Sequence, residues 1–301
     1  MGEVIDIHTH PVFLEPICAT DALLEQRRQA MGLYKAGTAS LEHIHNQMRC
    51  AGIDRLALLP LDLSTQENQV VVSNEEIKQL IDLDPRHFIG FASVDPYRPD
   101  ALDVLEHAFG DLGLAGLKLH PARQNFSPAS ESLEPIYALC LRYNKPIIFH
   151  AGLSLEPNTS LRYANPLEFE AVAERYPKLR VCLAHFGFPW VRETAALLLK
   201  YPNLYADTGL LYFDSAREFY EEVFTRMLGK YWVDRSLRHQ VMFGSNNPRF
   251  EQIRMAEALR LLEHLFAVGD QDVEGLLVGG LDEPANLFVD GAGDVFGIVP
   301  S

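Results

Sequence analysis

The segment VIDIHTHP (residues 4–11) is an apolar run that carries two histidines one residue apart. In a β-strand successive side chains point to opposite faces, so His8 and His10 would share one face while Ile5 and Ile7 occupy the other. Two neutral imidazoles side by side are typical of a shared cation. The alternative is a pair of ordinary core or loop histidines with separate partners.

Seven further apolar runs of similar length follow along the chain, each bounded by Pro, Gly, Asn or Asp. Near-continuous apolar strands are typical of a parallel sheet that is buried on both faces. The eight predicted strands cover residues 4–10, 55–61, 88–94, 116–120, 146–151, 180–185, 204–208 and 240–245.

Amphipathic segments fill the gaps between these strands. Residues 40–52 place apolar side chains on one helical stripe and end at a glycine, and residues 73–83 begin with a capping box of Ser73 and Glu76. Similar helical patterns separate the later strands, and another follows the last strand. The alternation therefore predicts an α/β fold of eight strand–helix units.

Eight such units in a chain of 301 residues favour a (β/α)₈ TIM barrel over a doubly wound sheet. No linker or low-complexity run divides the chain, so we expect a single domain over residues 1–301. Two segments fall outside the repeat. Residues 13–40 form an insertion after the first strand, which we expect to cap the barrel mouth, and residues 268–301 form a C-terminal extension.

Composition narrows the function classes. The formal net charge of −15 is spread along the chain, which argues against nucleic-acid partners and anionic membrane surfaces. The four cysteines show no CxxC or framework spacing, which favours free thiols in a reducing compartment. No stretch reaches the roughly 18 apolar residues of a membrane span, and no secretory leader is visible. We therefore expect a soluble cytoplasmic protein.

Histidines gather where a barrel places its chemistry, at the carboxyl ends of the strands. Five of the eleven histidines end predicted strands, namely His8, His10, His120, His150 and His185. The other six lie in predicted helices or at strand starts, and we expect them to be surface or capping residues: His43, His45, His87, His107, His239 and His264.

Packing alone gives a poor explanation for five imidazoles at one rim. Each buried imidazole needs partners for both nitrogens, and a crowded group needs a common partner. A divalent cation such as Zn²⁺, Fe²⁺ or Mn²⁺ meets that need. The sequence thus predicts that His8 and His10 are half of a metal site. Asp207, which ends the seventh strand, is a candidate for orienting a ligand.

Three basic residues also lie near strand ends. Lys118 shares a strand face with His120, where it would bind a substrate carboxylate, pair with an acid or extend toward the rim. Arg123 and Arg249 follow strand ends, where they would grip an anionic substrate or, alternatively, serve as ordinary loop arginines.

The ordered motifs IDIHTHP, GLKLHP, IIFHAG, LAHFG, FGSNNP and EPANLF span nearly the whole chain. In this set the sequence resembles the amidohydrolase superfamily, in the amidohydrolase-related branch of aminocarboxymuconate-semialdehyde decarboxylase, resorcylate-type decarboxylases and oxalomesaconate hydratase. The resemblance implies a metal-dependent enzyme of barrel fold, and it suggests a homodimer.

The resemblance also assigns roles. His8, His10 and His150 would hold the metal, with Asn246 at the eighth-strand position, and His185 would be the catalytic histidine or a further ligand. Lys118 and His120 match the fourth-strand pattern, in which the lysine is usually not a carboxylated metal bridge. One divalent metal, Zn²⁺ before Mn²⁺ or Fe²⁺, is therefore expected, with Lys118, His120, Arg123 and Arg249 binding substrate.

The eighth-strand motif departs from the family pattern GSD-x-P, because Asn246 stands where the family has a metal-binding and proton-handling aspartate. An amide offers a cation its carbonyl oxygen but accepts no proton from water. Three explanations stay open. Asn246 is an engineered isostere, or the natural enzyme uses His185 alone as its base, or metal chemistry has been lost.

These observations lead to three hypotheses of function. The first is a metal-dependent hydrolase or lyase acting on a small carboxylated substrate, with metal-activated water and His185 as the acid–base group. The second is a metal-independent lactonase that uses His185 or Lys118 to polarise the ester. The third is a ligand-binding pseudoenzyme, suggested by Asn246. Fold alone does not choose among them.

Overall fold

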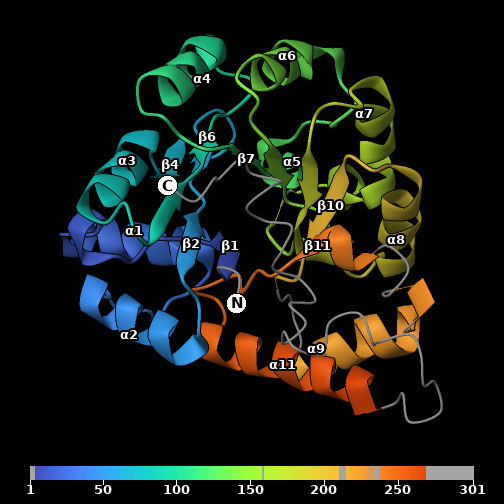
Figure 1. Ribbon diagram of the computed structural model, residues 1–301. Coiled ribbons are helices and arrows are strands. Elements are labelled where there is room, and N and C mark those ends of the chain that lie inside the picture. Colours follow the sequence, from blue (N-terminus) through green and yellow to red (C-terminus); the bar gives the residue numbers. More distant parts are fainter. Residues whose placement is uncertain (1–3, 158, 210–214, 230, 233–236, 269–301) are drawn as a thin grey trace.

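The computed structural model describes residues 4–157, 159–209, 215–229, 231–232 and 237–268. Beyond residue 268, the predicted C-terminal extension and its EPANLF motif lie outside the described residues. Each of the eight predicted strands is present, and each pairs in parallel with its neighbour, as Figure 1 shows. In chain order they are β1 (Ile5–Thr9), β2 (Arg55–Leu58), β5 (Phe88–Gly90) with β6 (Ala92–Ser93), β7 (Leu117–Leu119), β8 (Ile147–Phe149), β9 (Val181–Leu183), β10 (Leu204–Asp207) and β11 (Val241–Met242).

The third predicted strand is interrupted at Phe91. Its first part, β5, pairs with β2, and its second part, β6, pairs with β7. The hydrogen bonds between strands continue from one sheet to the other, because Phe91 N donates to Leu58 O (3.0 Å) and Ala92 N donates to Gly116 O (2.8 Å). The break therefore shifts the pairing without opening the barrel.

The other seam joins β1 to the chain that follows β11. Ile7 N donates to Phe243 O (3.0 Å), and His10 N donates to Asn247 O (2.7 Å). These bonds close the ring of eight strands, so the predicted TIM barrel is confirmed. They also bring the first-strand histidines against the eighth-strand residues that follow Phe243.

A buried carboxylate reinforces the same seam. Asp6 accepts hydrogen bonds from Ser245 N (2.9 Å), Ser245 Oγ (2.6 Å), Gln252 Nε2 (3.0 Å) and His8 N (3.1 Å). Complete burial outweighs these four bonds and raises the pKa of Asp6 to about 6. Asp6 thus ties the first strand to the eighth strand and to the helix after it.

Helices cover the outside of the barrel (Figure 1). The predicted caps are present, since Ser40 and Gly52 bound α2, and Ser73 and Glu76 form the capping box of α3. The helices are α1 (Asp21–Met31), α2 (Leu41–Ala51), α3 (Asn74–Leu83), α4 (Ala101–Gly110), α5 (Pro121–Gln124), α6 (Glu134–Arg142), α7 (Glu170–Arg175), α8 (Val191–Lys200), α9 (Ala216–Tyr220), continued by a π-helix (Glu221–Leu228), and α11 (Gln252–Val268). Short 3₁₀ turns cover Glu15–Ile17, Glu131–Leu133, Leu161–Ala164, Pro166–Phe169, Ala184–Gly187 and Leu237–His239.

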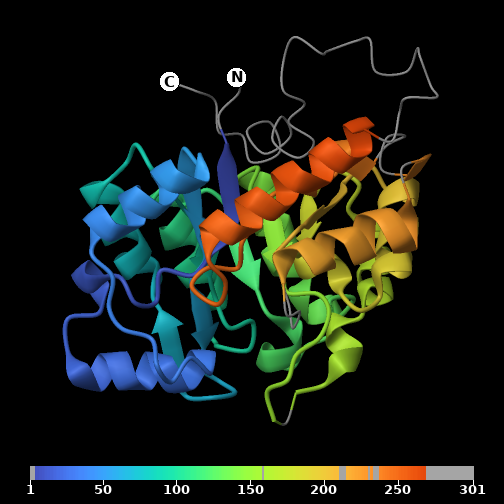
Figure 2. The same ribbon diagram turned by 90° about the horizontal axis from the view of Figure 1, so that it is seen from below.

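The insertion after β1 carries α1, which Figure 2 shows at the end of the molecule opposite α2 and α11. Buried Arg27 fixes α1 there, because its guanidinium donates to Ile17 O (2.6 Å) and Val12 O (3.1 Å) within the insertion. The same side chain donates to Val71 O (3.0 Å). Val71 belongs to an antiparallel hairpin that the sequence did not predict, β3 (Leu61–Leu63) and β4 (Gln69–Val72).

Apolar side chains form two layers. An outer layer lies between the strands and the helices. A smaller inner cluster fills the barrel interior, with contributions from β1, β2, β5, β8, β9 and β11, and includes Ile5 and Ile7. The simple alternation, which put these two residues on the face opposite His8 and His10, is wrong for β1, because the strand register shifts between Asp6 and Thr9. Within the described residues, no helix combines the length and apolar character needed to cross a membrane.

Candidate active site

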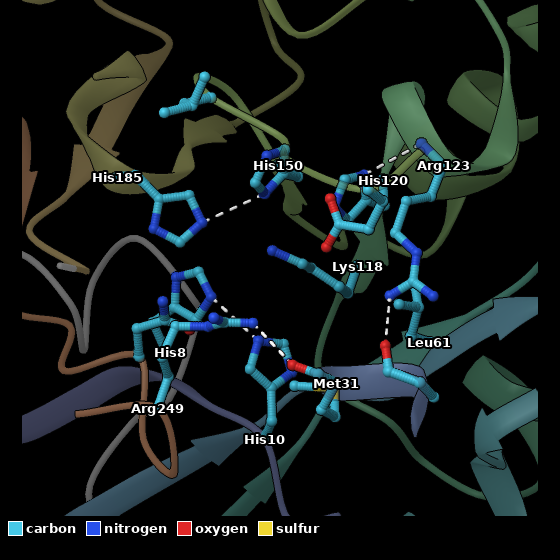
Figure 3. A pocket seen from close by; sticks show the side chains of 14 residues that line it. His8, His10, Met31, Leu61, Lys118, His120, Arg123, His150, His185 and Arg249 are labelled. Carbon is cyan, nitrogen blue, oxygen red and sulfur yellow. Dashed lines mark hydrogen bonds between the residues drawn. The ribbon is translucent and has the colours of Figure 1, made fainter. Parts of the chain in front are cut away.

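A small cavity of about 60 Å³ lies among the carboxyl ends of the strands. Nine of the ten residues that the sequence singled out for the site line it, all except Asp207, and Figure 3 shows most of the nine converging from different strands. The lining residues are His8, His10, Lys118, His120, Arg123, His150, His185, Asn246 and Arg249, together with Ala30, Met31, Leu61, Leu153 and Glu156. Their convergence is a structural fact, while the role of each residue stays a prediction.

A larger vestibule of about 790 Å³ adjoins this cavity and shares Arg123, Arg249 and Glu156 with it. Ala30 and Met31, which come from the end of α1, line both spaces. The insertion after β1 therefore helps to form the mouth, as expected from the sequence.

The first-strand histidines are held by their Nδ1 atoms. His10 Nδ1 donates to Leu59 O (3.1 Å), and His8 Nδ1 donates to the Asp207 carboxylate (2.8 Å), since a carbonyl and a carboxylate oxygen only accept. Each neutral ring then carries a bare lone pair on Nε2. The two Nε2 atoms face each other at 3.3 Å.

The fifth- and sixth-strand histidines form a second pair. His185 Nδ1 donates to Gly209 O (3.0 Å), which leaves a lone pair on His185 Nε2. That atom accepts from His150 Nδ1 at 3.2 Å, so the bare nitrogen of His150 is Nε2. His150 Nε2 is buried and has no hydrogen-bond partner among the described residues.

This arrangement fits a cation. Two bare lone pairs at 3.3 Å repel each other unless a positive charge lies between them, and a buried acceptor without a donor is costly. Two nitrogen ligands of a tetrahedral zinc ion, each about 2.0–2.1 Å from the metal, are themselves roughly 3.3 Å apart. The residues His8, His10 and His150 therefore present the donor chemistry that a divalent metal requires.

Electrostatics keep the imidazoles neutral. Burial, followed by the Coulombic interactions with Lys118 and His150, lowers the pKa of His8 well below its usual range. Burial likewise lowers the pKa of His10, His120 and His185, and that of His150 to about 3. Neutral rings are the form that binds metals.

Asp207 lies behind the histidines. Its Oδ1 accepts from the backbone N–H groups of His185 (2.9 Å) and Gly209 (2.8 Å), and its Oδ2 accepts from His8. The ligand atoms of His8, His185 and Asp207 also lie within 4.8 Å of one another, which defines a different candidate trio. Because the Asp207 oxygens are already hydrogen-bonded, we interpret Asp207 as the residue that orients His8.

His185 owes its position to an unusual backbone. Its φ is +60° and that of Phe186 is +49°, a region that non-glycine residues seldom adopt. The hydrogen bond from its own N–H to Asp207 supports that conformation. Left-handed backbone at the end of β9 therefore directs the imidazole into the cavity, and such conformations cluster at functional sites.

The fourth strand contributes a stacked ring and a buried cation. The rings of His120 and His150 lie 3.8 Å apart and nearly parallel, and His120 Nδ1 accepts from Arg123 N (3.3 Å). Lys118 Nζ is buried without a hydrogen-bond partner among the described residues. Burial, opposed by the Asp207 charge, lowers the pKa of Lys118 to about 8.

The two predicted arginines differ in their partners. Arg123 is engaged twice with Glu67, at 2.8 and 2.6 Å, and donates to Ala30 O (3.1 Å). Arg249 donates to Met31 O at 2.8 Å from the rim of the same cavity. A substrate carboxylate would displace Glu67 to reach Arg123, so the geometry favours Arg249 for that task.

Asn246 also lines the cavity, with its backbone in the left-handed region (φ +60°). Its backbone N–H donates to His8 O (2.9 Å), and its backbone carbonyl accepts from Arg249 N (3.0 Å). The eighth-strand position is thereby fixed beside the first-strand histidines, where the side chain supplies an amide in place of a negative charge.

Sequence reasoning missed Asp6, Glu67, Met31 and Glu156. Asp6 carried a signal, because an acidic residue inside an apolar strand needs buried partners. Met31 ends α1 of the insertion, and Glu67 and Glu156 lie in loops, so these three reach the site only through the folding of the insertion and the loops.

Fold and site together define a barrel enzyme with a histidine-rich mouth. The sequence pattern of the family described as Amidohydrolase matches residues 5–279, and the chain belongs to this family. The predicted superfamily and the prediction of an enzyme are thereby confirmed.

Known proteins add the following similarities. The chain is 31% identical over 85 residues to Protein fluG of Emericella nidulans, a match that covers 28% of this chain and 10% of that protein. A TIM-barrel protein of Bordetella bronchiseptica, Bb4693, superimposes with a TM-score of 0.66 at 21% identity, over 89% of this chain and 98% of that one. The 2,6-dihydroxybenzoate decarboxylase from Rhizobium gives a TM-score of 0.64 at 12% identity, over 99% of both chains. At these identities the two structures confirm the fold.

Proposed function

We propose that this chain is a metal-dependent hydrolase or lyase of the amidohydrolase superfamily that acts on a small carboxylated substrate. The observation that carries the proposal is the set of bare Nε2 lone pairs of His8, His10 and His150 in one buried cavity. Those three residues would hold the metal, with Asn246 beside them. A divalent cation there, Zn²⁺ before Mn²⁺ or Fe²⁺, would acidify water and polarise an oxygen of the substrate.

His185 is the candidate acid–base group. Its neutral ring presents the Nε2 lone pair to the cavity, where it now accepts from His150 Nδ1, while its Nδ1 proton is held by Gly209 O. The ring would accept a proton at Nε2 and return it to the product, and the Asp207 bond to its backbone would keep it aligned. That transfer would break the hydrogen bond that His150 Nδ1 now donates to the same Nε2.

Positive side chains support an anionic substrate. Lys118 and Arg249 line the cavity, which also lacks the aspartate common in the family. A carboxylate would satisfy the buried Lys118 Nζ and form a charge-assisted bond with Arg249. His120 would contact the substrate from the fourth strand, and Arg123 would position His120 and the mouth. The 2,6-dihydroxybenzoate named for the Rhizobium enzyme is a compound of this class.

The test combines metal content with turnover. The protein and its His8→Ala variant are assayed with aromatic and enol carboxylates, beginning with 2,6-dihydroxybenzoate, and bound metal is measured by elemental analysis. We expect one metal ion per chain and all turnover to disappear together in His8→Ala, while His107→Ala, a surface control, retains both. Turnover that persists in His8→Ala after its metal is lost would exclude this function.

A lactonase without metal is the second candidate. It is favoured by Asn246, which supplies no charge to a cation, and by Lys118, whose buried Nζ and pKa of about 8 suit the polarisation of an ester carbonyl. Exhaustive chelation separates the two functions, because the lactonase would keep its activity on a lactone panel. Lys118→Met would then abolish that activity.

The setting of the enzyme belongs to the same proposal. All four cysteines are free, and three of them are buried, which supports a reducing compartment and hence the cytoplasm. We further propose a single domain over residues 1–301 that forms a homodimer, for which size measurement in solution is the direct test.

A further inference from the structure

A second group of potential metal ligands lies outside the cavity. His45 Nε2 is 2.5 Å from Asp84 Oδ2, and His87 Nδ1 is 2.9 Å from both oxygens of the same carboxylate. One ligand atom from each of the three residues lies within 4.8 Å of the others, and the two rings are 4.8 Å apart, centre to centre. Two imidazoles thus converge on one carboxylate.

The group joins three separate elements. His45 is in α2, Asp84 ends α3, and His87 immediately precedes β5. In a parallel barrel the start of β5 is at the amino end of the strands, so the group lies at the end of the barrel opposite the cavity. None of its members lines that cavity.

Backbone hydrogen bonds hold the group in place. Phe88 N donates to Asp84 O (3.1 Å), and Leu56 N donates to His87 O (2.8 Å). These bonds fix the turn that carries Asp84 and His87 to the barrel. His45 lies in the middle of α2, so the helix holds its backbone in place. Ligands on rigid elements need little rearrangement to receive an ion.

We propose that His45, Asp84 and His87 form a second metal site, which binds one zinc ion per chain with water completing the coordination. Two imidazoles and a carboxylate are ligands that zinc prefers, and a site with three protein ligands leaves a position for water. The ion would take the place of the two ring protons that now point at the carboxylate, and each neutral ring would then carry its proton on its other nitrogen, His45 on Nδ1 and His87 on Nε2.

Exposure and charge suit this role. The side chains of His45 and His87 are 37% and 32% exposed, so an ion from solvent reaches them, while Asp84 is 11% exposed. Partial burial would raise the pKa of Asp84, but hydrogen bonds from His87 and His45 outweigh it and lower that pKa. The carboxylate therefore offers a full negative charge that is little screened by water.

The exposed pair His107–Asp111 provides a contrast. Its Nδ1–Oδ2 distance of 2.7 Å is equally short, but both partners lie in the last turn and cap of α4, and no second imidazole among the described residues joins them. Simple His–Asp pairing thus occurs elsewhere on the surface, and the second converging ring distinguishes the group of His45, Asp84 and His87. An ion bound there would cross-link α2 to the turn between α3 and β5.

Equilibrium dialysis against zinc chloride at micromolar free zinc tests the site, with bound zinc counted by elemental analysis. We expect H45Q and H87Q each to lower bound zinc by one ion per chain relative to the unmodified protein. Glutamine keeps a hydrogen-bond donor for Asp84, so both variants should fold. The matched controls H43Q, on the same helix, and H107Q should bind as much zinc as the unmodified protein.

The expected loss of one bound zinc ion per chain in H45Q and H87Q does not depend on whether the cavity also holds metal. Zinc should also raise the melting temperature of the unmodified protein more than that of H45Q. Unchanged zinc content in folded H45Q and H87Q would overturn the proposal. An equal loss in H43Q or H107Q would overturn it as well, because it would show unspecific surface binding.

Discussion

Asp207→Asn is the substitution that most directly tests how the cavity is organised. The Asp207 carboxylate accepts two backbone N–H groups at Oδ1 and the Nδ1 proton of His8 at Oδ2. In the variant, the amide oxygen retains the two backbone bonds, and the amide nitrogen faces His8. That nitrogen donates to Nδ1, so the His8 proton moves to Nε2 and the lone pair in the cavity is lost.

The size of the effect follows from these contacts. Removing a group that orients a metal ligand lowers metal affinity by about 10- to 100-fold, or about 1.4 to 2.8 kcal/mol of binding free energy. Global stability should change little, because two of the three bonds persist and the third is replaced by an N–H···N bond. We expect a loss of about 1 kcal/mol in the free energy of unfolding.

Three measurements check this reasoning. Zinc affinity is measured by competition with a chelator in the H45Q background, so that only the cavity is titrated. Nitrogen-15 NMR of the histidine rings reports which nitrogen of His8 carries the proton, and chemical denaturation reports stability. Asp62→Asn is the matched control, because Asp62 is another buried carboxylate but pairs with Arg98 (2.9 Å) and has no hydrogen bond to a histidine within the described part of the chain.

The reasoning is refuted if folded Asp207→Asn shows the proton on His8 Nε2 and yet binds zinc as tightly as the parent. It is equally refuted if the proton stays on Nδ1. Weaker binding in Asp62→Asn as well would show that the effect comes from a general loss of packing.

Three further substitutions test other parts of the structure. Asp6→Asn should lower the free energy of unfolding by about 1–3 kcal/mol in a denaturant titration, because an amide NH₂ would face donors that now meet a carboxylate. Unchanged stability would contradict the role given to Asp6 in joining β1 to the eighth strand. The free energy of unfolding of the parent should rise between about pH 8 and 10.5, by up to about 3 kcal/mol, because the unfolded Lys118 binds more protons than the folded one in that window, and Lys118→Met should remove this rise. Parallel pH profiles of parent and variant would disprove the lowered pKa. Asn246→Asp should strengthen zinc binding at least about tenfold in the H45Q background, since a carboxylate then faces the bare histidine nitrogens of the cavity. Unchanged affinity would place the eighth-strand side chain outside the metal site.

The sequence was sufficient for the architecture because each strand and helix carries its own local signal. The apolar runs and the capping residues of α2 and α3 depend on neighbours in the chain, and they are present where expected. The hairpin of β3 and β4 was missed, because the predicted strand 55–61 runs straight from β2 into Leu61. The contact between Arg27 of the insertion and Val71 of β4 joins residues 44 positions apart, which no local pattern reveals.

The convergence of the site residues was predictable from one geometric rule, that the carboxyl ends of parallel strands meet. Their hydrogen bonds were not predictable, because the partners lie far apart in sequence. Asp207 and His8 are 199 residues apart, and Arg123 and Glu67 are 56 apart. His45 and His87 illustrate the same point, since each reads as a surface residue until the fold brings both to Asp84.

The charge distribution of the cavity connects these observations. Asp207 would compensate a bound cation from behind His8, through a hydrogen-bonded ring, and Asn246 would add no charge at the front. The lining of the cavity, which includes Lys118 and Arg249, is therefore rich in positive groups and neutral rings. Glu156 is its single acidic member among the described lining residues. A carboxylated substrate would supply the negative charge that the eighth strand does not, so the departure at Asn246 and the proposed preference for an anion would have the same physical basis.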